Sequence, residues 1–310
     1  MRIVSLAGGI GGARFLRGLK AAAPDAEITV IGNTGDDITL FGLRVCPDLD
    51  TVMYTLGGGI NEEQGWGREK ETHVVKEELA AYGVEPQWFG LGDRDFATHI
   101  VRSQMLEAGY PLSQITEALC ARWQPGVRLI PMSDDRCETH VLLTDERGRR
   151  AVHFQEWWVR LRASVPAESI GLVGADSAKP APGVLEAVAE ADVVILPPSN
   201  PVVSIGTILQ VPGIRAAVEA KKVVGVSPII GGAPVRGMAD ACLSAIGVET
   251  SAQAVLELYG RPLIDGWLVA EQDAGVALDG VRVEARPLLM SDPDATRALA
   301  QATLDLAAAL

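Results

Sequence analysis

The sequence predicts an α/β fold: a Rossmann-like, doubly wound, mostly parallel sheet with a helical insertion. At the N-terminus a strand, a glycine turn, a helix and a second strand fit within about 30 residues, the pattern of a right-handed βαβ unit. Compact apolar runs, each with a helix before it, return in the second half of the chain. Because no repeat or obvious linker divides the 310 residues, we expect a single α/β domain over 1–310.

The N-terminal unit begins with the apolar strand Arg2–Leu6 and the glycine turn Ala7–Gly12. The helix Ala13–Ala23 places its apolar side chains on one face, as a helix packed on a sheet does. Glu27–Ile31 then follows as the second strand.

The middle of the chain changes character. A helical pattern covers three segments and nothing among them resembles a buried strand, so residues 60–125 are predicted to form a helical insertion within the domain. The three helices are expected over Glu71–Tyr82, Asp95–Gly109 and Pro111–Trp123. Thr139–Leu143 and Arg150–Phe154 then flank a turn sequence, which predicts a hairpin.

The parallel pattern resumes after the hairpin. Strands are expected at Asp192–Leu196, Lys222–Val226 and Ile264–Val269, and an alanine-rich helix at Asp294–Ala309. The carboxyl ends of these strands are the expected ligand-binding edge of the sheet.

The amino-acid composition limits the classes of partner that the protein is expected to bind. With 27 basic against 40 acidic residues the formal net charge is −13, which disfavours nucleic-acid binding. The four cysteines lie far apart, as reduced thiols of a cytoplasmic protein do, and no apolar run approaches the roughly 20 residues of a membrane helix. Glycine is enriched: its 33 residues are about 11% of the chain, against a usual share of about 7%.

Four glycines cluster in GGIGGAR, where the first strand meets the first helix. Glycines there let a phosphate approach the free amides of the helix, so Gly9, Gly11 and Gly12 are candidate nucleotide-binding residues, with Arg14 as a phosphate partner. The turn is not a P-loop, because no Lys-Ser or Lys-Thr follows it. A dinucleotide fingerprint would need a third glycine where Arg14 stands. The alternative is a tight turn whose glycines only serve helix–sheet packing.

Four aspartates follow the second strand within one loop region, at Asp36, Asp37, Asp48 and Asp50. Carboxylates beside a phosphate site repel the ligand unless a cation lies between them, and such oxygen ligands suit Mg²⁺. A free carboxylate there could also take a proton from an attacking hydroxyl. The alternative is ordinary turn chemistry, since aspartates often form turns and caps.

LGDRDFATH contains a second group of charges. An arginine between two carboxylates is held rigidly and presents its fork to a phosphate or a polar ring, which makes Asp93, Arg94 and Asp95 candidate substrate-binding residues. His99, one turn beyond Asp95, is expected to be a packed structural residue.

Two later strands end in loops of small, hydrogen-bonding residues. Ser199 and Asn200 follow one strand, and Ser227, Gly231 and Gly232 follow the next. Together with the glycine turn, these loops converge at one edge and predict a nucleotide pocket.

Read together, these segments resemble the 2-phospho-L-lactate transferase family of coenzyme F420 biosynthesis, including its phosphoenolpyruvate-using branch. The blocks that carry the resemblance are GGIGGAR, GNTGDD, CPDLDT, GDRDFATH, PMSDD-x-x-ETHV, HFQEWWV, PPSNPVVSIGTIL and SPIIGGAPVRG. The resemblance implies a magnesium-dependent homodimer. It also implies transfer of a phosphoenolpyruvyl or 2-phospho-L-lactyl group from a guanosine diphosphate-linked donor to the deazaflavin Fo, with release of GMP.

The resemblance also implies roles for particular residues. Asp50 and Arg94 match positions that hold the deazaflavin, while the glycine turn and the two later loops match the guanosine diphosphate side. Many relatives have lysine where Arg14 stands. We predict Asp50 and Asp37 as catalytic carboxylates, Asp50 as base or acceptor-positioning group, and Asp36, Asp37 and Asp50 as metal ligands.

Two other function classes remain open from the sequence. A nucleotide-sugar-binding regulatory protein, similar to the gluconeogenesis factor family, would share the glycine turn without catalysis. A dinucleotide-dependent oxidoreductase would also use such a turn, but Asn33 stands where the acid that binds the ribose is expected. The donor's acid, lactyl or enolpyruvyl, is not decided.

Overall fold

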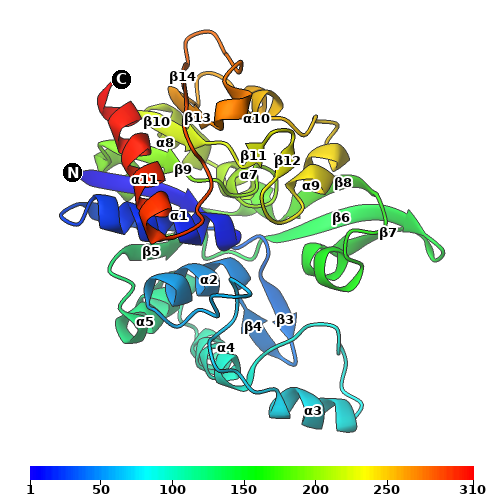
Figure 1. Cartoon of the computed structure of the whole chain (residues 1–310). Coiled ribbons are helices and arrows are strands. Elements are labelled where there is room, and N and C mark those ends of the chain that lie inside the picture. The colour runs from blue at the N-terminus through cyan, green and yellow to red at the C-terminus, as the bar shows by residue number, and fades with distance from the viewer.

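The computed structural model describes all residues, 1–310, and its centre is a seven-stranded sheet (Figure 1). All six strand pairings are parallel, in the order β14-β13-β10-β9-β1-β2-β5. The strands are β1 (Arg2–Ala7), β2 (Glu27–Gly32), β5 (Arg128–Pro131), β9 (Val193–Leu196), β10 (Val223–Val226), β13 (Gly266–Val269) and β14 (Arg282–Ala285). The predicted doubly wound parallel sheet is confirmed. The two edge strands, β5 and β14, were not predicted.

Helices cover both faces of this sheet, because its central strands are apolar on both sides. In β1, Ile3 belongs to one core of 31 buried residues and Val4 to a second core of 31. The first core is closed by α1 (Gly9–Ala22), α2 (Pro47–Leu56), α5 (Leu112–Trp123) and α11 (Pro293–Ala308). The second is closed by α6 (Val184–Glu190), α7 (Ile205–Gln210), α8 (Ile214–Glu219), α9 (Ala239–Ala245) and α10 (Ala252–Tyr259).

The segment 60–125 contains only helices as regular elements: α3 (Val74–Ala81), α4 (Asp93–Glu107) and α5. α3 has no buried residue, whereas α5 contributes Ile115 and Leu119 to the first core. In Figure 1, α3 and α4 lie below the main sheet and beside the small hairpin of β3 (Ile38–Leu40) and β4 (Leu43–Val45).

One prediction about this region is wrong. Asp36, Asp37, Asp48 and Asp50 do not share one loop, because α2 begins at Pro47 and puts Asp48 and Asp50 in its first turn. Proline is favoured at the start of a helix, where its missing N–H costs nothing. Pro47 of CPDLD therefore marks the start of a helix that was not predicted.

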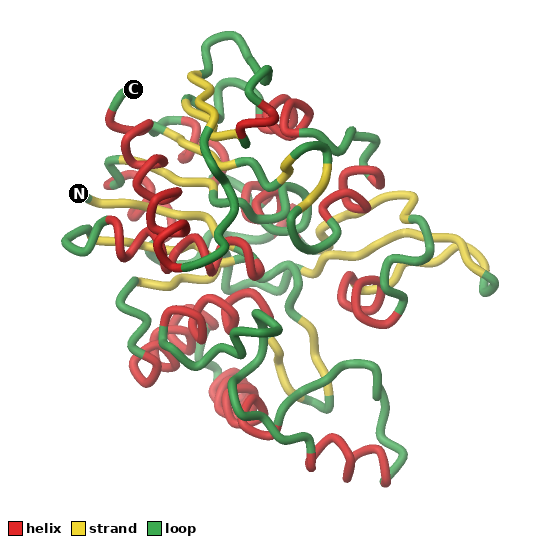
Figure 2. Tube along the Cα trace, in the orientation of Figure 1, coloured by secondary structure: helices red, strands yellow, loops and turns green.

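The predicted hairpin forms part of a three-stranded antiparallel arm beside the main sheet (Figure 2). The hairpin pairs β6 (Glu138–Asp145) with β7 (Gly148–His153), and the unpredicted β8 (Ala167–Val173) adds to the other side of β6. Between β7 and β8 lies a π-helical turn, Glu156–Arg160. A short two-stranded unit, β11 (Ile229–Ile230) and β12 (Ala233–Pro234), follows β10.

None of the helices combines the length and the apolar character needed to span a membrane.

Candidate functional site

The glycine turn lies where the strand order of the sheet reverses. β1 has β2 on one side and β9 on the other, so the connections leaving β1 and β9 run in opposite directions and open a crevice at their carboxyl ends. The loop after β9 closes on the turn: Ser199 Oγ donates to the carbonyl of Gly8 at 2.8 Å. The turn and the β9 loop therefore form one wall of the site.

Packing requires three of the four glycines in this turn. A Cβ on Gly8 would lie 2.5 Å from that of Ser204, and a Cβ on Gly12 would lie 2.5 Å from Ser199 Oγ. A Cβ on Gly11 would meet the carbonyl oxygen of Pro198. The packing interpretation of these glycines is therefore correct as far as it goes, and it does not exclude a ligand on the amides.

The first turn of α1 presents its backbone amides to the crevice. The N–H of Gly9 donates to Asp48 Oδ1 at 2.8 Å. The amides of the next two residues have no partner within the helix, because the first turn of any helix lacks acceptors. Arg14 is half-buried further along α1; burial, and next the charge of the neighbouring Arg236, lower its pKa. The nucleotide-binding roles of Gly9, Gly11, Gly12 and Arg14 stay predictions.

Asn33, at the end of β2, connects the walls of the crevice. Its Nδ2 donates to Asp48 Oδ2 at 2.9 Å and to the carbonyl of Val203 at 3.0 Å, and its Oδ1 accepts from Thr207 Oγ1 at 2.7 Å. Burial raises the pKa of Asp48 to about 6, with Asn33 and Gly9 partly offsetting the rise. Asn33, at the position where a ribose-binding acid would be expected, therefore holds the loops after β1, β2 and β9 together.

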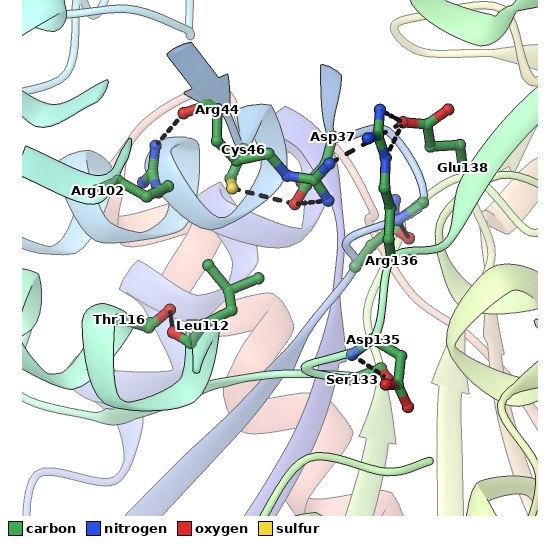
Figure 3. A network of polar contacts seen from close by, with 12 residues as sticks. Asp37, Arg44, Cys46, Arg102, Leu112, Thr116, Ser133, Asp135, Arg136 and Glu138 are labelled. Atoms are coloured by element: carbon green, nitrogen blue, oxygen red, sulfur yellow. Dashed lines mark hydrogen bonds and ion pairs between the residues drawn. The ribbon is translucent and has the colours of Figure 1, made fainter. Parts of the chain in front are cut away.

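Asp36 and Asp37 are both buried, and each keeps one unbonded oxygen. Asp37 Oδ2 accepts from Arg44 Nη2 at 3.1 Å and from Cys46 Sγ at 3.0 Å (Figure 3). Oδ1 of both aspartates is buried without a partner. Burial raises the pKa of Asp37 to about 6, and burial followed by the charges of Asp48 and Asp37 raises the pKa of Asp36 well above its ordinary value.

Buried carboxylate oxygens without a partner are the type of ligand that a divalent cation takes, and metal binding by Asp36, Asp37 and Asp50 stays a prediction. No group of three or more His, Cys, Asp or Glu side chains is arranged to hold a metal alone. Mg²⁺ does not need such a group, because it usually takes one or two carboxylates and completes its shell with waters and substrate phosphates. Of the predicted ligands, Asp36 and Asp37 suit that arrangement. Asp50 suits it less, because Arg102 already donates to both of its oxygens and balances its charge.

Asp50 points to the opposite side of α2, toward α4. Arg102 holds it through two hydrogen bonds, from Nη1 to Oδ2 at 3.1 Å and from Nη2 to Oδ1. Both residues are buried, with exposed fractions of 4% and 1%. Burial opposes the charge of Arg102, but the Asp50 carboxylate outweighs it and raises the pKa of the guanidinium above its ordinary value.

His99 continues this network along α4. Its Nδ1 lies 3.1 Å from Arg102 Nη1 and its Nε2 lies 3.3 Å from Asp95 Oδ2. Tyr54, on α2, donates to Asp95 Oδ1 at 2.7 Å. Burial would raise the pKa of Asp95, but the adjacent His99, the hydrogen bond from Tyr54 and the charge of Arg102 together lower it. His99 is thus a packed residue, as expected.

The three charged residues of GDRD separate in the structure. Asp93 caps α3, accepting from the amides of Val74 at 3.0 Å and Val75 at 2.9 Å. Glu71 in turn caps α4, accepting from the amides of Arg94 and Asp95 at 2.8 and 2.9 Å. The side chain of Arg94 is exposed, and only Asp95 joins Asp50 in the buried network. The substrate-binding roles of all three stay predictions.

The loops of the second half contain turn-forming bonds. Asn200 Oδ1 accepts from the amides of Val202 and Val203, and Ser227 Oγ donates to the carbonyl of Ile229. Gly231 and Gly232 have φ of +57° and +81°, a conformation that favours glycine. Nucleotide contacts by Ser199, Asn200, Ser227, Gly231 and Gly232 stay predictions.

Arg102, Tyr54 and Arg44 were not predicted as residues of the site. A spacing signal for the first two was present, because Asp95, His99 and Arg102 recur at i, i+4 and i+7 on α4. Asp50 and Tyr54 are likewise four residues apart on α2. Arg236, the arginine of the SPIIGGAPVRG loop, lies after β12, and its Nη2 donates to the carbonyl of Glu63 at 3.4 Å.

Comparison with known proteins identifies the family. The family model described as 2-phospho-L-lactate transferase CofD matches residues 3–300. The chain belongs to the 2-phospho-L-lactate transferase CofD family. It is 74% identical over 315 residues to a phosphoenolpyruvate transferase of Thermobifida fusca, covering 99% of this chain and 98% of that protein. It is 71% identical over 313 residues, with the same coverage, to one of Streptomyces griseus.

Membership of the CofD family makes the chain a transferase of coenzyme F420 biosynthesis, as the resemblance of its motifs implied. The fold has solved counterparts. A UPF0052 family protein from Bacillus halodurans superimposes with a TM-score of 0.62, covering 97% of this chain and 99% of that one. At 18% identity this likeness concerns the CofD fold alone.

Proposed function

We propose that the chain transfers a phosphoenolpyruvyl or 2-phospho-L-lactyl group from a guanosine diphosphate-linked donor to the deazaflavin Fo and releases GMP. One observation carries the proposal: the first turn of α2 directs Asp48 to the glycine turn and Asp50 to the α4 network. A single helical turn thus borders two different half-sites, as a reaction between two substrates needs. The relatives named above are phosphoenolpyruvate transferases, which favours the phosphoenolpyruvyl donor.

In this reaction the terminal ribityl oxygen of Fo forms a bond to the phosphorus nearer the acid. The bond from that phosphorus to the bridging oxygen breaks, GMP leaves with this oxygen, and the hydroxyl proton passes to a carboxylate or to water. Transfer between two oxygens depends on in-line positioning and charge stabilisation more than on a protein nucleophile. The crevice supplies both through rigid walls and free amides.

The donor half-site lies on the glycine turn. The amides of the first turn of α1 and the guanidinium of Arg14 would bind the diphosphate, whose negative charge favours a helix N-terminus. Ser199 bonds the turn directly, and Asn33 supports it through Asp48, which accepts from the N–H of Gly9. The buried Asp48, bonded to Gly9, orients the turn itself rather than the substrate.

Asp36 and Asp37 would hold a magnesium ion with their free oxygens, and the ion when bound neutralises charge on the diphosphate. Arg44 and Cys46 fix the other oxygen of Asp37, which keeps its free oxygen in one orientation. Asp50 would act as the acceptor-positioning carboxylate. Of its two predicted roles the geometry favours this one, because Arg102 already donates to both oxygens.

The direct test is product formation. The purified chain is incubated with Mg²⁺, Fo and either guanylated donor, and the product is identified by mass spectrometry while GMP is quantified. We expect Fo to gain a phosphoenolpyruvyl group with one GMP released per product. Failure to form product with either donor, in a preparation that still binds GDP, would instead support the nucleotide-binding regulatory alternative.

A further inference from the structure

The strongest polar contact outside the donor half-site is the pair between Arg102 and Asp50. The guanidinium meets both oxygens of the carboxylate, and Nη1 also lies 3.3 Å from the carbonyl of Arg44. Such a fork-to-fork pair fixes orientation as well as charge. An ionised carboxylate has about four acceptor positions, so about two remain for a ligand.

His99 supports the same arginine from its other side. Because a guanidinium can only donate, the Nδ1 of His99 that faces Arg102 Nη1 must be an acceptor. Its Nε2 lies 3.3 Å from Asp95 Oδ2 without a hydrogen bond between them. Asp50, Arg102, His99, Asp95 and Tyr54 thus form one buried cluster across α2 and α4.

We infer that Arg102 is a positioning residue for the acceptor: it holds the Asp50 carboxylate in the one orientation that accepts hydrogen bonds from the N–H and O–H groups of the deazaflavin. The inference rests on the proposed function. Arg102 itself is 1% exposed and touches no substrate, so it acts only through Asp50. The donor half-site is bounded by the other side of α2 and does not use this pair.

The test measures two affinities separately. Fluorescence titration gives the Kd of Fo, and calorimetry gives the Kd of GDP, for the wild-type chain, Arg102→Met and Arg102→Lys. We expect Arg102→Met to raise the Kd of Fo at least about tenfold, which corresponds to the loss of one charge-assisted hydrogen bond. The Kd of GDP should stay within about twofold. Arg102→Lys keeps the charge but loses the forked geometry of the guanidinium, so its Kd of Fo should lie between those of the wild type and Arg102→Met.

The matched control is Arg150→Met, which removes an arginine that bonds Asp145 through two nitrogens on the β6–β7 hairpin. It should leave both affinities unchanged. If Arg102→Met does not fold, the double variant Asp50→Asn with Arg102→Met is measured instead, because it removes both buried charges together. This double variant should bind Fo no more weakly than Asp50→Asn alone, because Arg102 acts through Asp50.

Three results would overturn the inference. They are an unchanged Kd of Fo in Arg102→Met, an equal loss of Fo and GDP binding, and additive losses in the double variant. No binding of Fo by the wild-type chain would overturn the proposed acceptor and this role with it. Binding of Fo by the wild type with an unchanged Arg102→Met would overturn the role of Arg102 alone.

Discussion

Each aspartate of the site has a role that its partners determine. Asp48 orients the glycine turn, Asp93 caps a helix, and Asp50 is held by an arginine, although the sequence presents all three as similar acids. Asp36 differs because it is buried with an oxygen that nothing in the chain satisfies. Two predictions at the residue scale follow from this division.

Replacement of Asp50 should remove activity without removing the nucleotide. In Asp50→Ala we expect product formation to fall at least about 100-fold, because the acceptor loses its positioning carboxylate, with GDP affinity largely intact. The variant leaves Arg102 buried and unpaired, at a cost of about 3–5 kcal/mol, so turnover and GDP titration must be made below its melting temperature. Turnover like that of the wild type would remove Asp50 from the mechanism.

Replacement of Asp36 should separate stability from metal binding. Since burial raises the pKa of Asp36, keeping it ionised at neutral pH costs folding stability, and Asp36→Asn should raise Tm by about 2 °C or more without metal. The same variant should lose the increase in Tm that Mg²⁺ gives the GDP-bound wild type. Thermal scans with and without Mg²⁺ measure both effects. A full Mg²⁺ response in the variant would contradict the assignment.

At the scale of elements, local patterns determined most of what the sequence could predict. The glycine turn between a strand and a helix, and the apolar runs of β9, β10 and β13, specify their own structure. The edge strands β5 and β14 were missed because each is only four residues long, too short to show a distinct pattern. Contacts between α2 and α4 were also missed, since Asp50 and Arg102 are 52 positions apart.

Close packing of α1 on the β9 loop predicts a sharp difference between two glycines. Gly11→Ala would push a methyl group into the carbonyl of Pro198, and we expect a loss of about 1–3 kcal/mol of unfolding free energy. Gly171 has neither a positive φ nor a neighbour within 4 Å of an added Cβ, so Gly171→Ala should stay within about 0.5 kcal/mol. Denaturant titration compares the two. Equal effects would show that α1 has room to move.

The reciprocal caps of α3 and α4 predict a local effect. Asp93→Ala should raise amide exchange rates in residues 72–81, because two amides lose their acceptor and α3 has no buried side chain to hold it. Asp292→Ala, which removes the cap of α11, is the matched control and should change exchange near residue 295 instead. Unchanged exchange over α3 in Asp93→Ala would mean that other contacts hold it.

For the molecule as a whole, the proposed function assigns the carboxyl edge of the sheet to the donor and the segment around α2 and α4 to the acceptor. The net charge of −13 is compatible with anionic substrates because several aspartates are buried against amides, arginines or one another. The sequence could predict the fold class. It could not predict that the first turn of α2 would contact both the glycine turn and the α4 network, because that depends on how α2 lies between α1 and α4.

A crystal structure with GDP, Mg²⁺ and Fo bound together tests this arrangement most directly. We expect the diphosphate on the first turn of α1, the metal at Asp36 and Asp37, and the polar groups of Fo at Asp50, with its ribityl hydroxyl directed at the diphosphate. Fo bound away from Asp50, or a diphosphate remote from the glycine turn, would contradict the two half-sites on α2.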